Sequence, residues 1–333
     1  MKRLEELEKR LREECPGLEL RKNEPMSKHT TLRVGGPAAL MAQPKTPGEA
    51  GDLLRVCQEQ KITPFFMGNG SNLLVSDQGY NGLVISTVRL DRLKRSENFI
   101  VAGSGVLLSK LANFAAQEGL SGLEWAAGIP GTVGGAVYMN AGAYGGEAVQ
   151  VLDFVNYFGE DVGSFRVMDG KLFLAFGTPS EKNGILNVNY REVENSTFSY
   201  RHSYFCDKEL FVTMAGFRLT RGDPGAIKAR MAELSAQRKA KQPLEYPSAG
   251  STFKRPAPLP DGTPVYAAAL IDQCGCKGLA VGGAQVSEKH AGFIVNRGGA
   301  TSADILALVE EVKKRVLDQT GVALELEVKT LGV

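Results

Sequence analysis

Residues 128–146 have the sequence GIPGTVGGAVYMNAGAYGG, with seven glycines and no charged side chain, and this composition constrains the fold more than any other part of the chain. Glycine raises the entropy cost of ordering a backbone, so such a density needs a physical reason. Flexible linkers are usually polar, whereas Val133, Val137 and Tyr138 are bulky and apolar. We interpret the stretch as backbone wrapped tightly around a flat or phosphorylated ligand. A flexible surface loop is the alternative.

A second glycine-rich segment, GNGSNL at residues 68–73, directly follows the apolar run at 64–67, which we predict to be a short strand. Glycines let backbone N–H groups approach a phosphate closely, and Ser and Asn side chains add donors, although a plain turn would explain the same residues. Neither segment contains a Walker phosphate loop or a Gly-x-Gly-x-x-Gly motif that opens a helix. The sequence therefore predicts a bulky, phosphate-bearing ligand bound outside both common phosphate-loop designs.

The chain has 333 residues, enough for two or three domains, and its composition is that of an ordinary globular protein. A formal charge of +2 provides no strong global field, so we expect no nucleic-acid partner and no membrane partner. The charged segment Met1–Glu14 lacks the apolar run of a signal peptide, and Pro130 argues against a membrane span in the uncharged stretch at 125–146. Five sparse cysteines favour free thiols in a reducing compartment, so we expect a cytoplasmic protein.

Hydrophobic periodicity predicts strands that alternate with helices, which indicates an α/β arrangement in the first half of the chain. The predicted strands are 38–42, 64–67, 82–86, 99–102, 165–168, 210–219, 292–296 and 324–329. The predicted helices are the leader at 1–14, a helix that starts at Pro47, and helices at 108–117, 225–241, 265–274 and 302–319. Residues 178–184 have the composition of a loop. Asp223 is the predicted N-cap of the long helix, and we place a domain boundary there.

Three polar groups could carry chemistry. The first is Tyr200–Ser203, just before a predicted strand, and the second is the loop at 247–256, where hydroxyls stand beside cations. The third is Glu325 with Glu327, on one face of the last predicted strand. Each also has an ordinary explanation: a surface ion pair, a turn hydroxyl and a solvated strand face.

A metal site and a serine hydrolase both have weak support. Cys274 and Cys276 with His290 lack the second ligand pair of structural zinc sites, so we predict no metal. No Gly-x-Ser-x-Gly motif is present, and three histidines offer few candidates for a catalytic base.

Taken together, these segments resemble the UDP-N-acetylenolpyruvoylglucosamine reductase family, which comprises flavoenzymes of peptidoglycan precursor synthesis. The matching segments follow the family's order along most of the chain: 31–36, 68–73, 130–146, 200–203, 242–256, 294–301 and 324–332. The short spacing from Gln242 to Ser251 resembles the branch that lacks an added substrate-capping loop.

The resemblance implies an FAD-binding PCMH-type fold, α/β and α+β in class, of the type shared with vanillyl-alcohol-oxidase-like flavoproteins, plus a C-terminal α/β substrate domain. We expect a helical leader at 1–29, an FAD-binding domain of two subdomains at 30–222, split near residue 90, and a substrate-binding domain at 223–333. The resemblance also implies non-covalent FAD, NADPH as reductant and a UDP-sugar substrate, and we expect a monomer. In the implied reaction, hydride from NADPH passes through the flavin to UDP-N-acetylglucosamine enolpyruvate, which gives UDP-N-acetylmuramate.

By the same resemblance, Arg201 is the cation that stabilises an enolate-like species, Glu327 is its partner across the substrate carboxylate, and Ser251 is the proton donor. The residues implied to cradle the flavin cofactor are Gly68, Asn69, Gly70, Ser71, Asn72, Leu73, Pro130, Gly131, Thr132, Gly134, Gly135, Ala136 and Asn140. The candidates for binding the UDP-sugar are Tyr200, Lys241, Gln242, Lys254 and Arg255, with Lys254 also supporting proton donation by Ser251.

The sequence departs from the family pattern between about 153 and 198, where we expect an insertion within 159–195 that decorates the surface. Covering the site or reshaping substrate access are the alternatives.

The alternative activity is an FAD-dependent oxidase of a small alcohol or sugar. Such enzymes often tether flavin through His or Cys, and no His lies in either glycine-rich segment. A non-catalytic UDP-sugar or nucleotide sensor is a third hypothesis, against which the co-occurrence of Arg201, Ser251 and Glu327 argues.

Overall fold

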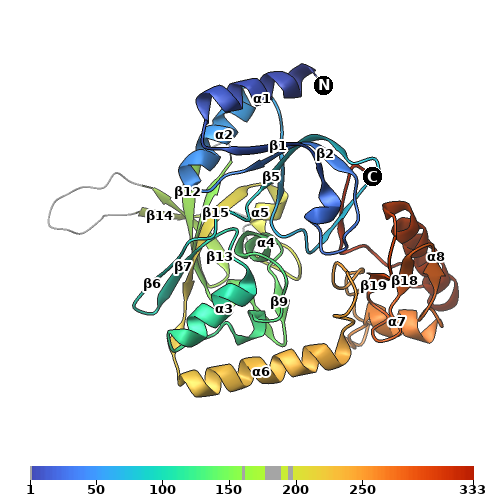
Figure 1. Ribbon diagram of the computed structural model, residues 1–333. Coiled ribbons are helices and arrows are strands. Elements are labelled where there is room, and N and C mark those ends of the chain that lie inside the picture. Colours follow the sequence, from blue (N-terminus) through green and yellow to red (C-terminus); the bar gives the residue numbers. More distant parts are fainter. Residues whose placement is uncertain (1, 160–161, 177–188, 194–197) are drawn as a thin grey trace.

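The computed structural model describes residues 2–159, 162–176, 189–193 and 198–333 (Figure 1). A four-stranded sheet with two helices lies at the N-terminal end, next to a seven-stranded sheet, and a smaller C-terminal unit combines helices with a three-stranded sheet. The C-terminus itself lies back beside the N-terminal sheet. The long helix α6 (Pro224–Lys241) runs from the seven-stranded sheet toward the C-terminal unit (Figure 1). Among the described residues, no helix is both long and apolar enough to cross a membrane.

The N-terminal sheet has the strand order β1-β2-β5-β3, in which β1 is antiparallel to β2, and β5 runs parallel to both β2 and β3. Its elements are α1 (Lys2–Glu14), β1 (Glu19–Pro25), β2 (Pro37–Gln43), α2 (Pro47–Glu59), β3 (Phe65–Met67) and β5 (Tyr80–Ser86). Thr46 caps α2 by accepting from the Glu49 N–H at 3.1 Å, and Pro47 occupies the first turn. Leu7 and Leu11 are fully buried against α2, which confirms the predicted leader helix and its apolar stripe.

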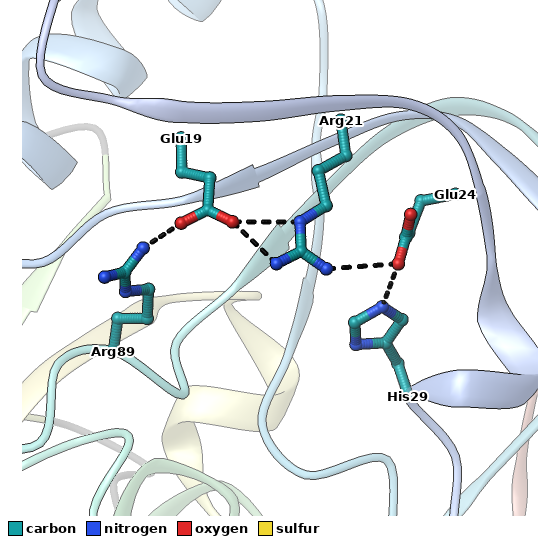
Figure 2. A network of polar contacts seen from close by, with 5 residues as sticks. All are labelled: Glu19, Arg21, Glu24, His29 and Arg89. Carbon is teal, nitrogen blue, oxygen red and sulfur yellow. Dashed lines mark hydrogen bonds and ion pairs between the residues drawn. The ribbon is translucent and has the colours of Figure 1, made fainter.

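A chain of polar contacts orders the edge of this sheet (Figure 2). Arg21 bonds Glu19 at 2.6 Å and Glu24 at 3.2 Å, Glu24 also bonds His29 at 2.8 Å, and Glu19 pairs with Arg89. The His29 hydrogen bond is the main cause that lowers the pKa of Glu24. These groups are partly solvated, so the network contributes little to stability and mainly fixes β1 against the segment before β2 and the segment after β5.

The larger sheet is wholly antiparallel, with the order β14-β13-β12-β11-β15-β7-β6. Its strands are β6 (Leu93–Ser96), β7 (Phe99–Gly103), β11 (Leu152–Phe158), β12 (Val162–Met168), β13 (Lys171–Phe176), β14 (Asn189–Glu192) and β15 (Phe211–Arg218). Helix α3 (Leu108–Gln117) has the predicted bounds and buries Leu108, Leu111 and Ala112 in the same core. The predicted strands at 99–102, 165–168 and 210–219 are confirmed.

The described part of the expected insertion forms β12, β13 and β14 on one side of this sheet, of which β14 is the edge strand. Phe165, Val167 and Leu172 on β12 and β13 are buried in its core, so surface decoration is wrong for these strands. The physical reason is that their alternating apolar residues extend one buried face outward from β11. The loop predicted at 178–184 lies outside the described residues.

Short elements surround the glycine-rich segments. They are η1 (Met26–Lys28), β4 (Leu73–Val75), β8 (Leu120–Ser121), η2 (Glu124–Ala126), α4 (Val133–Tyr138), β9 (Gly142–Ala143), β10 (Gly146–Glu147), η3 (Ala148–Gln150), α5 (Tyr204–Asp207) and β16 (Thr220–Arg221). Asp223 caps α6 by accepting from the Ala226 N–H at 2.7 Å, as predicted. Ile227 and Met231 of α6 pack into the core of the seven-stranded sheet.

The C-terminal unit packs α7 (Ala267–Gln273) and α8 (Ser302–Thr320) on a small sheet of β17 (Ala280–Val281), β18 (Ala284–Val286) and β19 (Ile294–Asn296). The predicted strand at 324–329 is wrong in position. The strand is β20 (Lys329–Leu331), which pairs in parallel with β4, whereas Leu326 makes only an isolated bridge to Phe253. Alternating apolar and polar residues indicate an extended segment with one apolar and one polar face. The position of the partner strand decides which residues form the hydrogen-bonded ladder.

Asp77, just after β4, fastens α8 to the rest of the molecule. Its carboxylate accepts from the N–H groups of Ser302 at 2.8 Å and Ala303 at 3.1 Å, in addition to the helix's own Thr301–Asp304 capping box. Burial opposes ionisation, but these bonds hold the pKa of Asp77 below its usual value.

We expect Asp77→Ala to lower the free energy of unfolding by about 1–2 kcal/mol at neutral pH, because two N–H groups at a helix start lose their acceptor. The lowered pKa means that this contribution is present above the ordinary aspartate pKa and disappears as the pH falls through the folded-state value. Denaturant unfolding at neutral and acid pH measures the difference, with Gln78→Ala as the neighbouring control. Equal unfolding free energies for Asp77→Ala and the wild type at neutral pH would contradict this assignment.

Candidate active site

The two glycine-rich segments lie side by side. Asn69 Nδ2 donates to the Pro130 carbonyl at 2.8 Å, and a Cβ at Gly68 would stand 2.2 Å from Thr132 Oγ1. Gly70 adopts φ +59°, where a Cβ would meet the His29 carbonyl at 2.1 Å. Only glycine permits both approaches, so the backbone forms the walls of a shared cradle.

The remaining residues implied to hold FAD continue this cradle. Thr132 caps α4 by accepting from the Gly135 N–H at 3.4 Å, and a Cβ at Gly134 would stand 2.9 Å from that of Ser104. The side chains of Leu73 and Ala136 are buried in the apolar cores.

Unused polar groups around the cradle fit a bound dinucleotide. In the described part of the chain, the backbone N–H groups of 69–72 have no protein acceptor. The buried hydroxyls of Ser86, Thr87 and Ser104 also have no partner there. Buried donors without partners are costly, so a ligand that accepts hydrogen bonds would relieve them. These residues therefore fit FAD, whose phosphates and flavin ring edge are rich in acceptors.

Arg238 is a candidate that sequence analysis missed. The Arg238 side chain is half-buried, and its Nε atom is buried with no hydrogen-bond partner among the described residues. It packs against the glycine-rich segment, because a Cβ at Gly128 would stand 2.9 Å from Arg238 Cδ. Burial lowers the pKa of Arg238. The sequence did contain a signal for Arg238: at helical spacing it continues the buried stripe of Met231 and Leu234 on α6. A cation on an apolar stripe beside the cradle is suited to an anionic ligand.

Arg201 and Glu327, which are 126 residues apart in the chain, meet in the structure. Arg201 Nε donates to Glu327 Oε1 at 2.8 Å, and its Nη2 donates to the Gly142 carbonyl at 3.1 Å. The side chains are 23% and 12% exposed, so water screens the pair weakly. Asn72 Nδ2 donates to the Glu327 carbonyl at 3.1 Å, which joins the pair to the cradle.

A tight turn presents Arg201. Ser199 and His202 exchange backbone hydrogen bonds of 3.1 and 3.2 Å, and Arg201 takes the left-handed conformation at φ 56°. Such strain in a non-glycine residue is typical of functional sites. Asn140 Nδ2 donates to the Ser199 carbonyl, and its Oδ1 accepts from the Val149 N–H. Asn140 thus acts on the site through this turn, and its contact with the cofactor stays a prediction.

Glu327 is not part of a solvated strand face. Glu325, two residues earlier, is 73% exposed, whereas Glu327 is 12% exposed. Burial raises the pKa of Glu327, although the charge and hydrogen bond of Arg201 and the charge of Lys254 oppose that shift. The solvated explanation therefore holds for Glu325 and is wrong for Glu327.

Ser251 lies on the segment that pairs with the backbone of Glu327. Its neighbour Thr252 accepts at its carbonyl from the Glu327 N–H at 2.9 Å, so the two segments lie side by side there. Ser251 is exposed, and its hydroxyl has no partner among the described residues. Lys254 bonds Glu325 Oε2 at 3.0 Å. The Ser251 hydroxyl is therefore available to a ligand, on a segment whose backbone bonds Glu327.

The remaining sugar-binding candidates divide into two groups. Arg255 lies over the rings of Tyr200 at 5.2 Å and Tyr266 at 4.9 Å, and Tyr200 also contacts Arg201 at 4.9 Å. Lys241 and Gln242 instead end α6, and the structure records no contact between them and the Arg201–Glu327 pair. The Oε1 atom of Gln242 is buried without a partner among the described residues.

No group of three or more His, Cys, Asp or Glu residues able to hold a metal occurs among the residues that the structure describes. Cys274 and Cys276 are buried, and Cys276 Sγ contacts the Cys274 carbonyl at 3.7 Å.

Comparison with known proteins gives consistent matches along the chain. A family model for the UDP-N-acetylenolpyruvoylglucosamine reductase C-terminal domain matches residues 242–331, and a model for an FAD binding domain matches residues 38–158. The UDP-N-acetylenolpyruvoylglucosamine reductase of Caldanaerobacter subterraneus subsp. tengcongensis is 43% identical over 310 residues, which cover 93% of each chain.

Two further matches cover nearly the whole chain. A protein of the same name from Agathobacter rectalis is 44% identical over 337 residues, covering 97% of this chain and 98% of the relative. The crystal structure of UDP-N-acetylenolpyruvylglucosamine reductase from Thermus caldophilus superposes with a TM-score of 0.69 at 34% identity, covering 94% of this chain and 98% of that one.

Proposed function

The chain belongs to the UDP-N-acetylenolpyruvoylglucosamine reductase family, and from this premise we propose that Arg201, Ser251 and Glu327 are its catalytic residues. It is a flavin-dependent oxidoreductase of peptidoglycan synthesis with an FAD-binding PCMH-type domain. It uses NADPH to reduce UDP-N-acetylglucosamine enolpyruvate to UDP-N-acetylmuramate. The oxidase of a small alcohol or sugar is not favoured, because the C-terminal substrate domain matches the reductases.

One observation carries the residue assignment: the weakly solvated Arg201–Glu327 pair is hydrogen-bonded to the glycine cradle through Asn72 and adjoins the Ser251 segment. Bound FAD supplies the hydride that reaches the enolpyruvyl double bond. Arg201 stabilises the negative charge that then develops beside the substrate carboxylate, since preorganised charge acts strongly where water is excluded. Glu327 holds the guanidinium in position, and the Ser251 hydroxyl donates a proton to the alpha carbon, with Lys254 nearby.

We assign cofactor binding to the cradle residues 68–73, 130–132, 134–136 and Asn140, and add Arg238. The UDP-sugar binds Tyr200, Lys241, Gln242, Lys254 and Arg255 in this proposal. We also propose a division of the chain into a leader at 1–29, a flavin domain at 30–222 and a substrate domain at 223–333. The proposal further includes a monomeric state, a cytoplasmic location and no nucleic-acid or membrane partner. Free donors in the cradle support the cofactor assignment. The ring contacts of Tyr200 with Arg201 and Arg255, and the charge of Lys254 near Glu327, support the sugar assignment. For Lys241 and Gln242 the support is the resemblance to the family.

The activity is tested by NADPH consumption in the presence and absence of UDP-N-acetylglucosamine enolpyruvate, with the product identified by mass. We expect substrate-dependent consumption and a product heavier by two hydrogens. Consumption without any change in the sugar nucleotide would contradict the proposed reaction.

We expect the rate of substrate reduction to fall as the pH drops through the pKa of Glu327, because protonation removes the charge that orients Arg201. Burial raises that pKa, so the fall should begin at a higher pH than for an exposed glutamate. Glu327→Gln should lower the rate about tenfold or more at neutral pH and abolish this acidic limb, while flavin reduction by NADPH is spared. Single-turnover rates of flavin reduction by NADPH and of substrate reduction by the flavin, each measured as a function of pH, test these expectations.

Glu325→Gln is the matched control and should keep the acidic limb, since Glu325 is solvated. If the fall of the substrate-reduction rate at acid pH persists unchanged in Glu327→Gln, the group whose protonation causes it is not Glu327.

A further inference from the structure

An open pocket of about 380 Å³ lies where three loops meet, at residues that the catalytic assignment does not use. Arg33 comes from the loop before β2, Tyr246 from the loop after α6, and Asn296 and Arg297 from the end of β19. Gly298 and Gly299 complete the rim with positive φ, and a Cβ on either would meet nothing within 4 Å. The pocket is therefore open to a ligand of substantial size.

The two arginines of this pocket are uncompensated. Among the described residues, neither Arg33 nor Arg297 forms an ion pair or donates a side-chain hydrogen bond, and no acidic residue lines the pocket. Arg297 lies over the ring of Tyr246 at 4.1 Å, which orients its guanidinium plane. Two free guanidiniums facing one concave surface are suited to an anion with several acceptor oxygens.

Buried hydrogen bonds hold both arginines in place. Asn296 is 7% exposed; its Nδ2 donates to the Leu32 carbonyl at 3.0 Å, and its Oδ1 accepts from the Gly298 N–H at 2.9 Å. One amide thus ties the residue before Arg33 to the turn that carries Arg297. Arg33 itself has φ 55°, in a turn closed by Thr30 Oγ1, which donates to the Val34 carbonyl at 2.9 Å. Strain supported by such bonds is common at binding sites.

The pocket lies close to the reaction centre along the chain. Pro247 lines it, and Ser251 follows four residues later, a span of at most about 14 Å. An extended dinucleotide could therefore reach from one to the other.

We propose that Arg33 and Arg297 bind a phosphate monoester, the 2′-phosphate of NADPH, and so select NADPH over NADH. This inference rests on the proposed function, which supplies NADPH as the reductant. The 2′-phosphate is the only group that distinguishes the two nucleotides, and it is a dianion with three acceptor oxygens near neutral pH, like other phosphate monoesters. Arginine is the usual partner of this group in other nucleotide-binding folds, and Tyr246 with Arg297 offers a flat surface beside it.

The test compares flavin reduction by NADPH and by NADH in the FAD-loaded full chain, for the wild type, Arg33→Gln and Arg297→Gln. We expect each substitution to raise the apparent dissociation constant for NADPH about tenfold and to leave the limiting rate and all NADH values unchanged. Arg221→Gln, which removes an exposed arginine charge on β16, is the matched control and should keep the preference for NADPH. An unchanged NADPH:NADH preference in both pocket variants would overturn the proposal.

A binding measurement separates this proposal from the reductase activity itself. Calorimetric titration of the same protein with adenosine 2′-monophosphate should show binding that is weakened about tenfold in Arg297→Gln, with weaker binding of adenosine 5′-monophosphate. If inorganic phosphate binds as tightly as the 2′-nucleotide, the pocket takes a free anion and the assignment to NADPH is overturned. A wild type that binds the 2′-nucleotide but oxidises neither reductant would count against the proposed function, not against the pocket.

Discussion

Ser251→Ala should reduce turnover of UDP-N-acetylglucosamine enolpyruvate by about two orders of magnitude or more, the usual scale for a lost general acid. Reduction of the bound flavin by NADPH should proceed at the wild-type rate, because the hydroxyl acts only when the alpha carbon takes its proton. The substitution should not disturb the fold, since Ser251 is exposed and its hydroxyl has no partner among the described residues. Anaerobic stopped-flow spectroscopy follows the two half-reactions separately.

Two variants sharpen this measurement. Ser251→Cys keeps a proton donor at the same position and should recover part of the lost rate. Ser248→Ala removes a hydroxyl from the same loop and should behave as wild type. Full turnover in Ser251→Ala would show that the proton comes from another group.

Arg201→Met should slow substrate reduction by about 100- to 1,000-fold, because the charge developing beside the substrate carboxylate loses its preorganised partner. NADPH should still reduce the flavin. The substitution also leaves the Glu327 carboxylate, 12% exposed, without its guanidinium partner, so the free energy of unfolding should fall at neutral pH. Arg201→Lys keeps the charge without the planar guanidinium and should give an intermediate rate.

A double substitution distinguishes catalysis from stability. Arg201→Met with Glu327→Gln removes the unpaired carboxylate, so it should regain unfolding free energy without regaining turnover. If turnover returned with stability, Arg201 would be a structural residue. The comparison uses denaturant unfolding and single-turnover rates on the same preparations.

Local sequence signals predict much of this fold. Helix α8 begins at the Thr301–Asp304 capping box and ends at Gly321, in the left-handed conformation, because these residues satisfy its terminal N–H and C=O groups. The predicted bounds of α3 are confirmed for a similar reason, since its apolar stripe ends just before Gly119. Patterns of this kind depend only on neighbours within one or two turns.

Long-range pairing was the part that local signals could not supply. Residues 324–329 alternate like a strand, but β4 offers its edge to Lys329–Leu331, so the ladder forms there. Glu325 and Glu327 lie two residues apart in the same alternating pattern, so the pattern predicts the same exposure for both. Glu327 is enclosed because Arg201, 126 residues away in the chain, pairs with it. The positive φ of Arg201 likewise follows from a turn that Asn140 anchors, which no local motif reveals.

Arg238 shows how a sequence signal can be present and still be overlooked. Its place on the buried stripe of α6 is visible in the sequence, but an arginine near a helix C-terminus also suits the helix dipole without any ligand. Only the unpartnered Nε beside Gly128 distinguishes the two explanations.

The visible spectrum of the purified protein under anaerobic conditions is the most direct test of flavin-mediated transfer at this site. We predict flavin absorption bands that NADPH bleaches and that UDP-N-acetylglucosamine enolpyruvate then restores without oxygen, with one equivalent of UDP-N-acetylmuramate formed per flavin. A protein reconstituted with FAD that shows no flavin bands, or a bleached spectrum that persists after the sugar nucleotide is added, would contradict it.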